Sequence, residues 1–141
     1  MTDTEALDLE FARRGLAAQP FSELVGARVT EFGDGVAVLE IDNREDLRQQ
    51  NGFLHGGVIC YAADNALTFA AGSVLGPALL TSGLSIEYIR PAQGSVLRAR
   101  ATVVHAGRRK AVCRCEVSSV DDDGVEQTVA VAQGTIMSSG R

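Results

Sequence analysis

The chain has 141 residues, a formal net charge of −5, 45% hydrophobic residues and 22% charged residues. This length allows one domain with a substantial core, and the composition is typical of globular proteins rather than of disordered chains or membrane proteins. An acidic chain has no general attraction for nucleic acid or anionic lipid, so we expect no nucleic-acid partner and no membrane partner.

The N-terminal residues carry neither a basic region nor an apolar run. We therefore expect no signal peptide and a cytoplasmic location. The three cysteines, Cys60, Cys113 and Cys115, lack the spacing of a disulfide framework or a zinc site, which favours reduced thiols and no metal. In a strand, Cys113 and Cys115 would point to the same face.

The first expected element is a short amphipathic helix within residues 1–18, with Thr4 as its N-cap. Pro20 ends this helix, and the next residues predict a turn or a single helical turn up to Gly26. Two antiparallel strands follow, because alternating apolar residues flank FGDG, a hairpin signal. Phe32 fits the alternation only after a slip in register.

A long helix is predicted over residues 56–76, after the sequence His-Gly-Gly. Its apolar residues spread around the whole circumference, which predicts burial on nearly every side. At about 1.5 Å per residue the helix is about 30 Å long, enough to cross a bilayer. However, Asp64, Asn65 and Thr68 lie at its middle, where a carboxylate in lipid would cost several kcal/mol. A helix wrapped by a sheet is the better interpretation.

Four further segments alternate apolar and polar residues, and the first of them stops at Pro91. The short turns after it predict antiparallel pairing, so we expect these four strands to form a meander. A sheet of about six strands buries a hydrophobic helix by curling around it. We therefore predict a single α+β domain over residues 1–141.

Three features now point to a family. They are the loop QQNGFLHGG (residues 49–57), Asp64 nine residues after His55, and the strand end SIEYIRP with GRR at a later turn. This combination resembles the PaaI-type (phenylacetate-degradation) acyl-CoA thioesterases over residues 20–138. The resemblance implies a hotdog fold, an acyl-CoA substrate and no cofactor apart from the coenzyme A of the substrate. It also implies a homodimer, often assembled into a homotetramer, with active sites between subunits.

The resemblance also implies roles for individual residues. The family acid maps to Asp64, and the amide that helps to place the thioester maps to Gln49, six residues before His55. A hydroxyl residue ten positions before the strand-end proline maps to Thr81. Asn51 and Gly56, in the same loop and helix start, are expected to contact the substrate.

Thioester hydrolysis needs a group that stabilises an oxyanion and another that activates water or attacks the carbonyl. The first turn of a helix offers unpaired N–H groups, and glycines allow a carbonyl to approach closely. Gly57 is therefore the expected oxyanion donor. Alternatively, the two glycines only let the loop enter a crowded helix start.

Asp64 lies seven residues after Gly57, about 10 Å along the helix axis, so it cannot reach a carbonyl held by Gly57 of its own chain. Two antiparallel helices about a twofold axis would bring Asp64 of one chain opposite Gly57 of the other, which predicts an obligatory dimer. Asp64 is then either a general base or a nucleophile. A purely structural carboxylate is the alternative. We expect His55 to position the loop rather than to act as a base.

Coenzyme A carries several negative charges, which an acidic protein must meet with a local basic cluster. Arg108, Arg109 and Lys110 at a turn, with Arg90 at a strand end, are the expected phosphate-binding cations. A charged turn in solvent is the alternative.

The sequence therefore predicts a thioester hydrolase acting on small to medium acyl-CoA or aryl-acyl-CoA. An acyl carrier protein thioesterase and a non-catalytic acyl-CoA-binding protein remain alternatives, although a binder has little use for a carboxylate at Asp64. Some apolar residues favour an apolar or aromatic acyl group: Phe53, Leu54, Tyr61 and Phe69.

Overall fold

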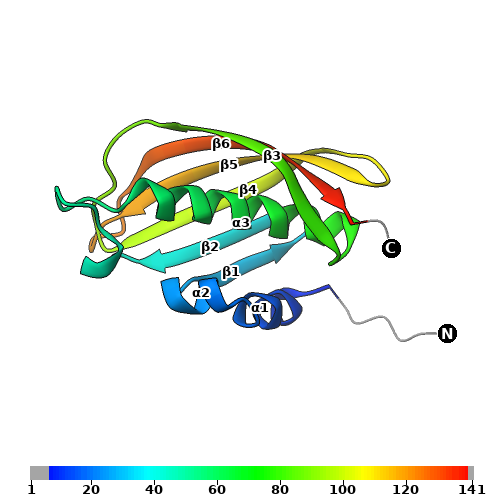
Figure 1. The fold of residues 1–141 in the computed structure, drawn as a ribbon, viewed down its shortest axis with the longest axis horizontal. Coiled ribbons are helices and arrows are strands. Elements are labelled where there is room, and N and C mark those ends of the chain that lie inside the picture. Colours follow the sequence, from blue (N-terminus) through cyan, green and yellow to red (C-terminus); the bar gives the residue numbers. More distant parts are fainter. Residues whose placement is uncertain (1–6, 140–141) are drawn as a thin grey trace.

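The computed structural model describes residues 7–139 as one curved antiparallel sheet with a long helix lying across it (Figure 1). The helices are α1 (Leu9–Ala17), α2 (Pro20–Val25) and α3 (Gly56–Leu75), and a short 3-10 turn, η1, covers Glu45–Leu47. The strands are β1 (Arg28–Gly33), β2 (Val36–Asp42), β3 (Leu79–Tyr88), β4 (Val96–Ala106), β5 (Lys110–Val120) and β6 (Glu126–Ser138). This is the hotdog arrangement expected from the sequence.

The order of strands in the sheet is β1-β2-β4-β5-β6-β3. β4, β5 and β6 form the expected meander, but the prediction that β3 precedes them as a neighbour of β4 is wrong, because β3 pairs with β6. β3 also ends at Tyr88 rather than at Pro91. The segment 89–95 can extend about 23 Å, enough to cross the about 14 Å from β3 to β4, so its shortness does not require a hairpin.

The long helix α3 packs against the concave face of the sheet (Figure 1). Its fully buried residues are small or aliphatic: Ile59, Ala62, Ala63, Ala66, Leu67, Ala70, Ala71 and Gly72. By length and composition alone α3 is the one helix within residues 7–139 that could cross a membrane. Its burial against the sheet accounts for that composition, and the polar residues at its middle are half-buried rather than exposed.

Helices α1 and α2 lie beside β1 at one edge of the fold (Figure 1). The prediction that the first helix begins after Thr4 is wrong: the Asp8 carboxylate accepts a hydrogen bond from the Phe11 N–H, so α1 begins at Leu9. Thr4 itself lies outside the described residues. Pro20 opens α2, and Gly26 ends it in the left-handed conformation that glycine favours.

The hairpin between β1 and β2 is as predicted. Asp34 and Gly35 both have positive φ angles, 53° and 79°, which is the pattern of a type I′ turn. The register shifts between Val29 and Glu31, and this bulge is the slip that the position of Phe32 indicated.

Strand β3 forms an edge of the sheet, since only β6 pairs with it. Large apolar side chains remain exposed along this strand and just beyond it, with exposed fractions of 66% for Leu80, 52% for Tyr88 and 48% for Ile89. This edge is the side of the sheet on which a further strand could add.

Candidate active site

Two predicted site residues, Asp64 and Thr81, are in direct contact. The Thr81 hydroxyl, on β3, donates a 2.7 Å hydrogen bond to Asp64 Oδ1, on α3. Thr68, one turn after Asp64, donates to the Asp64 backbone carbonyl at 2.9 Å and lies 3.2 Å from the Thr81 hydroxyl. All three side chains are half-buried. The carboxylate is therefore oriented by a neighbouring strand and retains one oxygen for another partner.

The start of α3 is capped by a side chain of its own loop. His55 is the N-cap, and its Nδ1 accepts a 2.8 Å hydrogen bond from the Gly57 N–H. The expected positioning role of His55 fits this geometry. In contrast, the Gly57 amide is not free to act as the expected oxyanion donor, because it is occupied by the imidazole. Within residues 7–139 the Gly56 N–H has no acceptor, so Gly56 takes its place as the candidate donor.

Tyr88 ties the end of β3 to the same helical turn. Its hydroxyl donates to the Gly56 carbonyl at 3.1 Å, and its ring lies 3.6 Å from the place where a Gly56 Cβ would stand. Burial, followed by the neighbouring Cys60 thiol, raises the pKa of Tyr88, so the phenol stays protonated and able to donate. The first turn of α3 is thus held from both the loop and the sheet.

A hollow of ≈ 470 Å³ opens beside this turn. Gln49, Asn51, Gly56 and Arg90 all line it, so the structure brings these four predicted residues together. The Gln49 side-chain oxygen accepts a hydrogen bond from the Asn51 N–H and so shapes its own loop. Gly56 therefore borders a space large enough for part of a ligand.

The predicted basic cluster is split. Arg90 bonds the Thr128 carbonyl at one end of β6, whereas the Arg109 carbonyl accepts from the Ser138 N–H at the other end. Ten residues of strand separate the two places by about 33 Å, so one chain cannot use them on the same phosphates. Arg108, Arg109 and Lys110 are exposed, and none forms an ion pair within the described part of the chain.

Asp64 and Gly56 are eight residues apart on α3, about 12 Å along the helix axis. The carboxylate of one chain therefore cannot act on a carbonyl bound at the Gly56 amide of the same chain. The residues arrange as two half-sites: a hydrogen-bonded carboxylate at mid-helix and an amide donor beside a hollow at the helix start. Such a pair suits acyl transfer, in which one group holds the oxyanion and the other handles the proton or attacks the carbonyl.

The family follows from comparison with known proteins. A family model described as the thioesterase superfamily matches residues 51–126, more than half of the chain. The chain belongs to the thioesterase superfamily. The matched segment runs from the loop that holds Asn51 to the start of β6, and it includes both half-sites.

Individual thioesterases align over most of their length. A 1,4-dihydroxy-2-naphthoyl-CoA hydrolase of Listeria monocytogenes is 26% identical over 116 residues, which cover 81% of this chain and 91% of the relative. The acyl-coenzyme A thioesterase PaaI of Escherichia coli is 27% identical over 114 residues, covering 80% and 78%. The crystal structure of a thioesterase family protein from Silicibacter pomeroyi superposes with a TM-score of 0.83 at 31% identity, covering 89% and 93%. The predicted family and fold are confirmed.

Two residues of this thioesterase site did not receive a role from the sequence. In the sequence, Thr68 is one polar residue in a hydrophobic helix, although its position four residues after Asp64 places both on one face. Tyr88 belonged to the strand motif, yet its hydrogen bond to Gly56 depends on β3 packing beside the start of α3, which no local pattern reveals. Within residues 7–139 no group of three or more His, Cys, Asp or Glu side chains could hold a metal ion.

Proposed function

We propose that this thioesterase hydrolyses acyl-CoA thioesters, with small to medium or aryl acyl groups, at sites shared between two protomers. The observation that carries the proposal is the Asp64 carboxylate, held at 2.7 Å by Thr81 in the middle of a core helix. Partial burial of a carboxylate costs free energy of folding, even with a hydrogen-bond donor beside it, and a role in hydrolysis explains why a carboxylate stands there. Relatives named as hydrolases of CoA thioesters support the substrate class.

The proposed roles follow from the two half-sites. The thioester carbonyl lies at the Gly56 amide, where the N–H and the helix dipole stabilise the developing oxyanion. As a general base, Asp64 of the other protomer removes a proton from the attacking water, the C–S bond breaks, and this proton passes to the coenzyme A thiolate. As a nucleophile, Asp64 attacks the carbonyl carbon, the C–S bond breaks to release the coenzyme A thiolate, and water then cleaves the resulting Asp64–acyl anhydride to the free acid while its proton goes to the thiolate. His55 keeps the helix start in place, and Gln49 shapes the loop beside it.

A pairing of two protomers also explains why the predicted phosphate-binding cations lie at two distant places in one chain. An antiparallel arrangement of two protomers across their β3 edges would bring the turn of one chain, with Arg108, Arg109 and Lys110, toward Arg90 of the other. The exposed apolar residues of β3 would be covered by this pairing. We propose a homodimer that further pairs into a tetramer, acts in the cytoplasm and needs neither metal nor redox cofactor.

The test uses two inactive variants that complement each other only if the site is shared. Asp64→Asn removes the carboxylate, and a loss of about 10²–10⁴-fold in kcat is expected. Gly56→Pro removes only the amide donor, since proline is favoured at the first helical position and the His55 backbone is already extended. If sites are shared, a 1:1 mixture of the two variants, unfolded and refolded together, should regain about a quarter of wild-type activity.

The controls isolate each change. Gly56→Ala keeps the amide and adds a Cβ at ordinary contact distance from the Tyr88 ring, so any activity that Gly56→Pro loses beyond Gly56→Ala reports the loss of the amide donor itself. Asp34→Asn makes the same chemical change as Asp64→Asn at a turn far from the site and should leave kcat unchanged. Absence of any recovery in the mixture, with mixed dimers demonstrated by mass spectrometry, would disprove the shared site. Full activity of Asp64→Asn would remove the carboxylate from the mechanism.

A further inference from the structure

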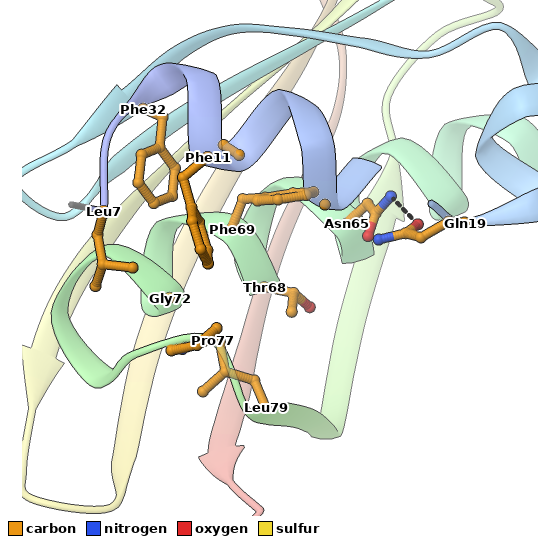
Figure 2. A pocket seen from close by; sticks show the side chains of 12 residues that line it. Leu7, Phe11, Gln19, Phe32, Asn65, Thr68, Phe69, Gly72, Pro77 and Leu79 are labelled. Carbon is orange, nitrogen blue, oxygen red and sulfur yellow. Dashed lines mark hydrogen bonds between the residues drawn. The ribbon is translucent and has the colours of Figure 1, made fainter. Parts of the chain in front are cut away.

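The first turn of α3 and its second half are held by different parts of the fold. A cavity of ≈ 250 Å³ lies between α1 and α3, where Phe11, Phe32 and Phe69 gather, and it borders residues 65–72 of α3 (Figure 2). None of the described residues that line this cavity belongs to the first turn of α3. That turn lies beside the hollow of ≈ 470 Å³, which Tyr88 also lines. Its side-chain contacts come from its own loop and from β3.

Tyr88 reaches the first turn from the end of β3. It pairs with Ala130, which is buried, so its ring points to the concave face of the sheet, where α3 lies. The hydroxyl donates to the Gly56 carbonyl at 3.1 Å. The ring packs on the same residue, since a Cβ on Gly56 would lie 3.6 Å from it. Tyr88 therefore holds the carbonyl end of the Gly56–Gly57 peptide group.

His55 holds the other end of the same peptide group. The Gly56 carbonyl and the Gly57 N–H belong to one planar unit and point in opposite directions. The Gly57 N–H donates to His55 Nδ1 at 2.8 Å, and a Cβ on Gly57 would lie 3.0 Å from that nitrogen. One phenol and one imidazole thus hold a single peptide group between them. A rotation of this group would break both hydrogen bonds at once.

This peptide group is one that the helix alone restrains weakly. Glycine has the widest choice of backbone conformations, and here two glycines adjoin. At the start of a helix the N–H groups have no intrahelical acceptor, so the helix does not fix the Gly57 N–H. Without Tyr88 and His55, the Gly56–Gly57 group has more freedom to rotate than the peptide groups of the following turns.

The restraint bears on the candidate oxyanion donor. The Gly56 N–H belongs to the preceding peptide group, and the φ and ψ angles of Gly56 relate that group to the Gly56–Gly57 group. The carbonyl of the preceding group, that of His55, accepts from the Val58 N–H at 3.0 Å. With both peptide groups held, the Gly56 N–H keeps one orientation before a substrate arrives. Such preorganisation favours oxyanion stabilisation, because the donor need not reorient during the reaction.

We propose that Tyr88 is a positioning residue for the oxyanion donor, acting through the Gly56–Gly57 peptide group that it holds together with His55. The inference rests on the proposed thioesterase function and adds a residue to which that function gives no part. Both hydrogen bonds are exposed in one chain. The proposed pairing across the β3 edges would cover Tyr88 and reduce the competition from water.

The first experiment removes the hydroxyl and keeps the ring. Tyr88→Phe should lower kcat for acetyl-CoA and benzoyl-CoA by about 3–10-fold, the range expected for one neutral hydrogen bond, and change KM by less than about twofold. Ser73→Ala is the matched control, because the Ser73 hydroxyl accepts from the Gly35 N–H at the other end of α3, and it should leave kcat unchanged. An unchanged kcat in Tyr88→Phe would overturn the proposal, and a rise in KM alone would show that Tyr88 contacts the substrate instead.

The second experiment tests whether Tyr88 and His55 act on one peptide group. The loss of kcat caused by Tyr88→Phe should be about threefold or more larger in a His55→Ala background than in the wild type, because the second hydrogen bond is then absent as well. Urea unfolding of the four proteins shows whether each is folded under the assay conditions. Equal fold-changes in the two backgrounds would show that the two residues act independently and would overturn the shared peptide group.

The third experiment observes the hydrogen bond to the substrate. In the Asp64→Asn variant, the infrared band of bound acetyl-CoA with a carbon-13 label at its thioester carbonyl reports hydrogen bonding to that carbonyl. The band should lie below that of free acetyl-CoA, and adding Tyr88→Phe should broaden it and move it back toward the free value. The affinity for acetyl-CoA, measured by calorimetry, should change by less than about twofold. A loss of stability alone would not move the band, so a band unchanged by Tyr88→Phe would overturn the positioning role.

The infrared band and the turnover together separate the positioning role from the proposed function. A band that depends on Tyr88, without hydrolysis by the wild type, would refute the proposed function alone. Hydrolysis by the wild type, with kcat and the band both indifferent to Tyr88→Phe, would refute the positioning role alone. Absence of both binding and hydrolysis would refute both.

Discussion

The Thr81 hydroxyl donates a 2.7 Å hydrogen bond to Asp64 Oδ1, joining the edge strand β3 to the middle of α3. The two residues are 17 positions apart in the chain. Because the donor comes from a strand and the acceptor from a helix, the orientation of the carboxylate depends on how β3 packs over α3. We therefore propose a positioning role for Thr81.

Replacing Thr81 by valine should lower kcat by about 10–100-fold, because a hydrogen bond to a charged group contributes about 1.5–3 kcal/mol. KM should change little if the bond only orients Asp64. Thr81→Ser restores the hydroxyl and should rescue most of the loss. Thr102→Val, at an exposed position on β4, is the matched control. Wild-type kcat for Thr81→Val would show that Asp64 does not need this donor.

His55→Asn tests whether the histidine does more than cap the helix. Asparagine is among the best N-caps, so the variant should keep its thermal stability and most of its kcat. His55→Ala should lose about 1 kcal/mol in the free energy of unfolding measured with urea. If His55→Asn folds normally but loses kcat by orders of magnitude, the imidazole itself takes part in catalysis.

Charge reversal at Arg108 and Arg109 should raise KM for acyl-CoA by about tenfold or more and leave kcat nearly unchanged, because the exposed turn would meet phosphates remote from the reacting carbonyl. The KM of the wild type should also rise with salt concentration, and the KM of the double variant should rise less. Arg114→Glu, exposed on β5, serves as the control. A KM unaffected by the double reversal would leave the turn as an ordinary solvated surface.

The buried thiols predict a dependence of stability on alkaline pH. Burial raises the pKa of Cys113 to about 11 and of Cys115 to about 12, from an ordinary value of 9.0. Above about pH 9 the unfolded chain releases these protons and the folded chain retains them, so the free energy of unfolding should fall from about pH 9 to about pH 12. Cys113→Ala with Cys115→Ala should flatten this slope in urea titrations. In the native wild type both thiols should resist alkylation at pH 8.

Local sequence patterns correctly predicted those structural features that depend on residues close together in the chain. The type I′ turn at Asp34 and Gly35, the slip before Phe32 and the extent of α3 all follow from residues close in sequence. The expectation that Cys113 and Cys115 share a face is confirmed, since both are buried in β5. Each of these is governed by the strand or helix period or by the turn residues themselves.

Other features required the tertiary structure. The place of β3 beside β6 could not be read from segment 89–95, because this length permits both a hairpin and a crossing. Gly56 rather than Gly57 is the candidate oxyanion donor because the His55 imidazole turns toward the Gly57 N–H. The sequence of two adjacent glycines does not indicate the direction of that ring. The cavity under α1 arises where Phe11, Phe32 and Phe69 meet from three elements, and no local pattern brings the first two to the side of Phe69.

The unpaired edge of β3 makes a newly synthesised chain prone to aggregation. Ten residues of strand, with Leu80 two-thirds exposed, present unpaired backbone groups to any extended polypeptide until the proposed dimer forms. Overproduction that outpaces pairing, or dilution that separates the protomers, should therefore promote precipitation. Catalytic competence and protection from aggregation would then be acquired in the same encounter.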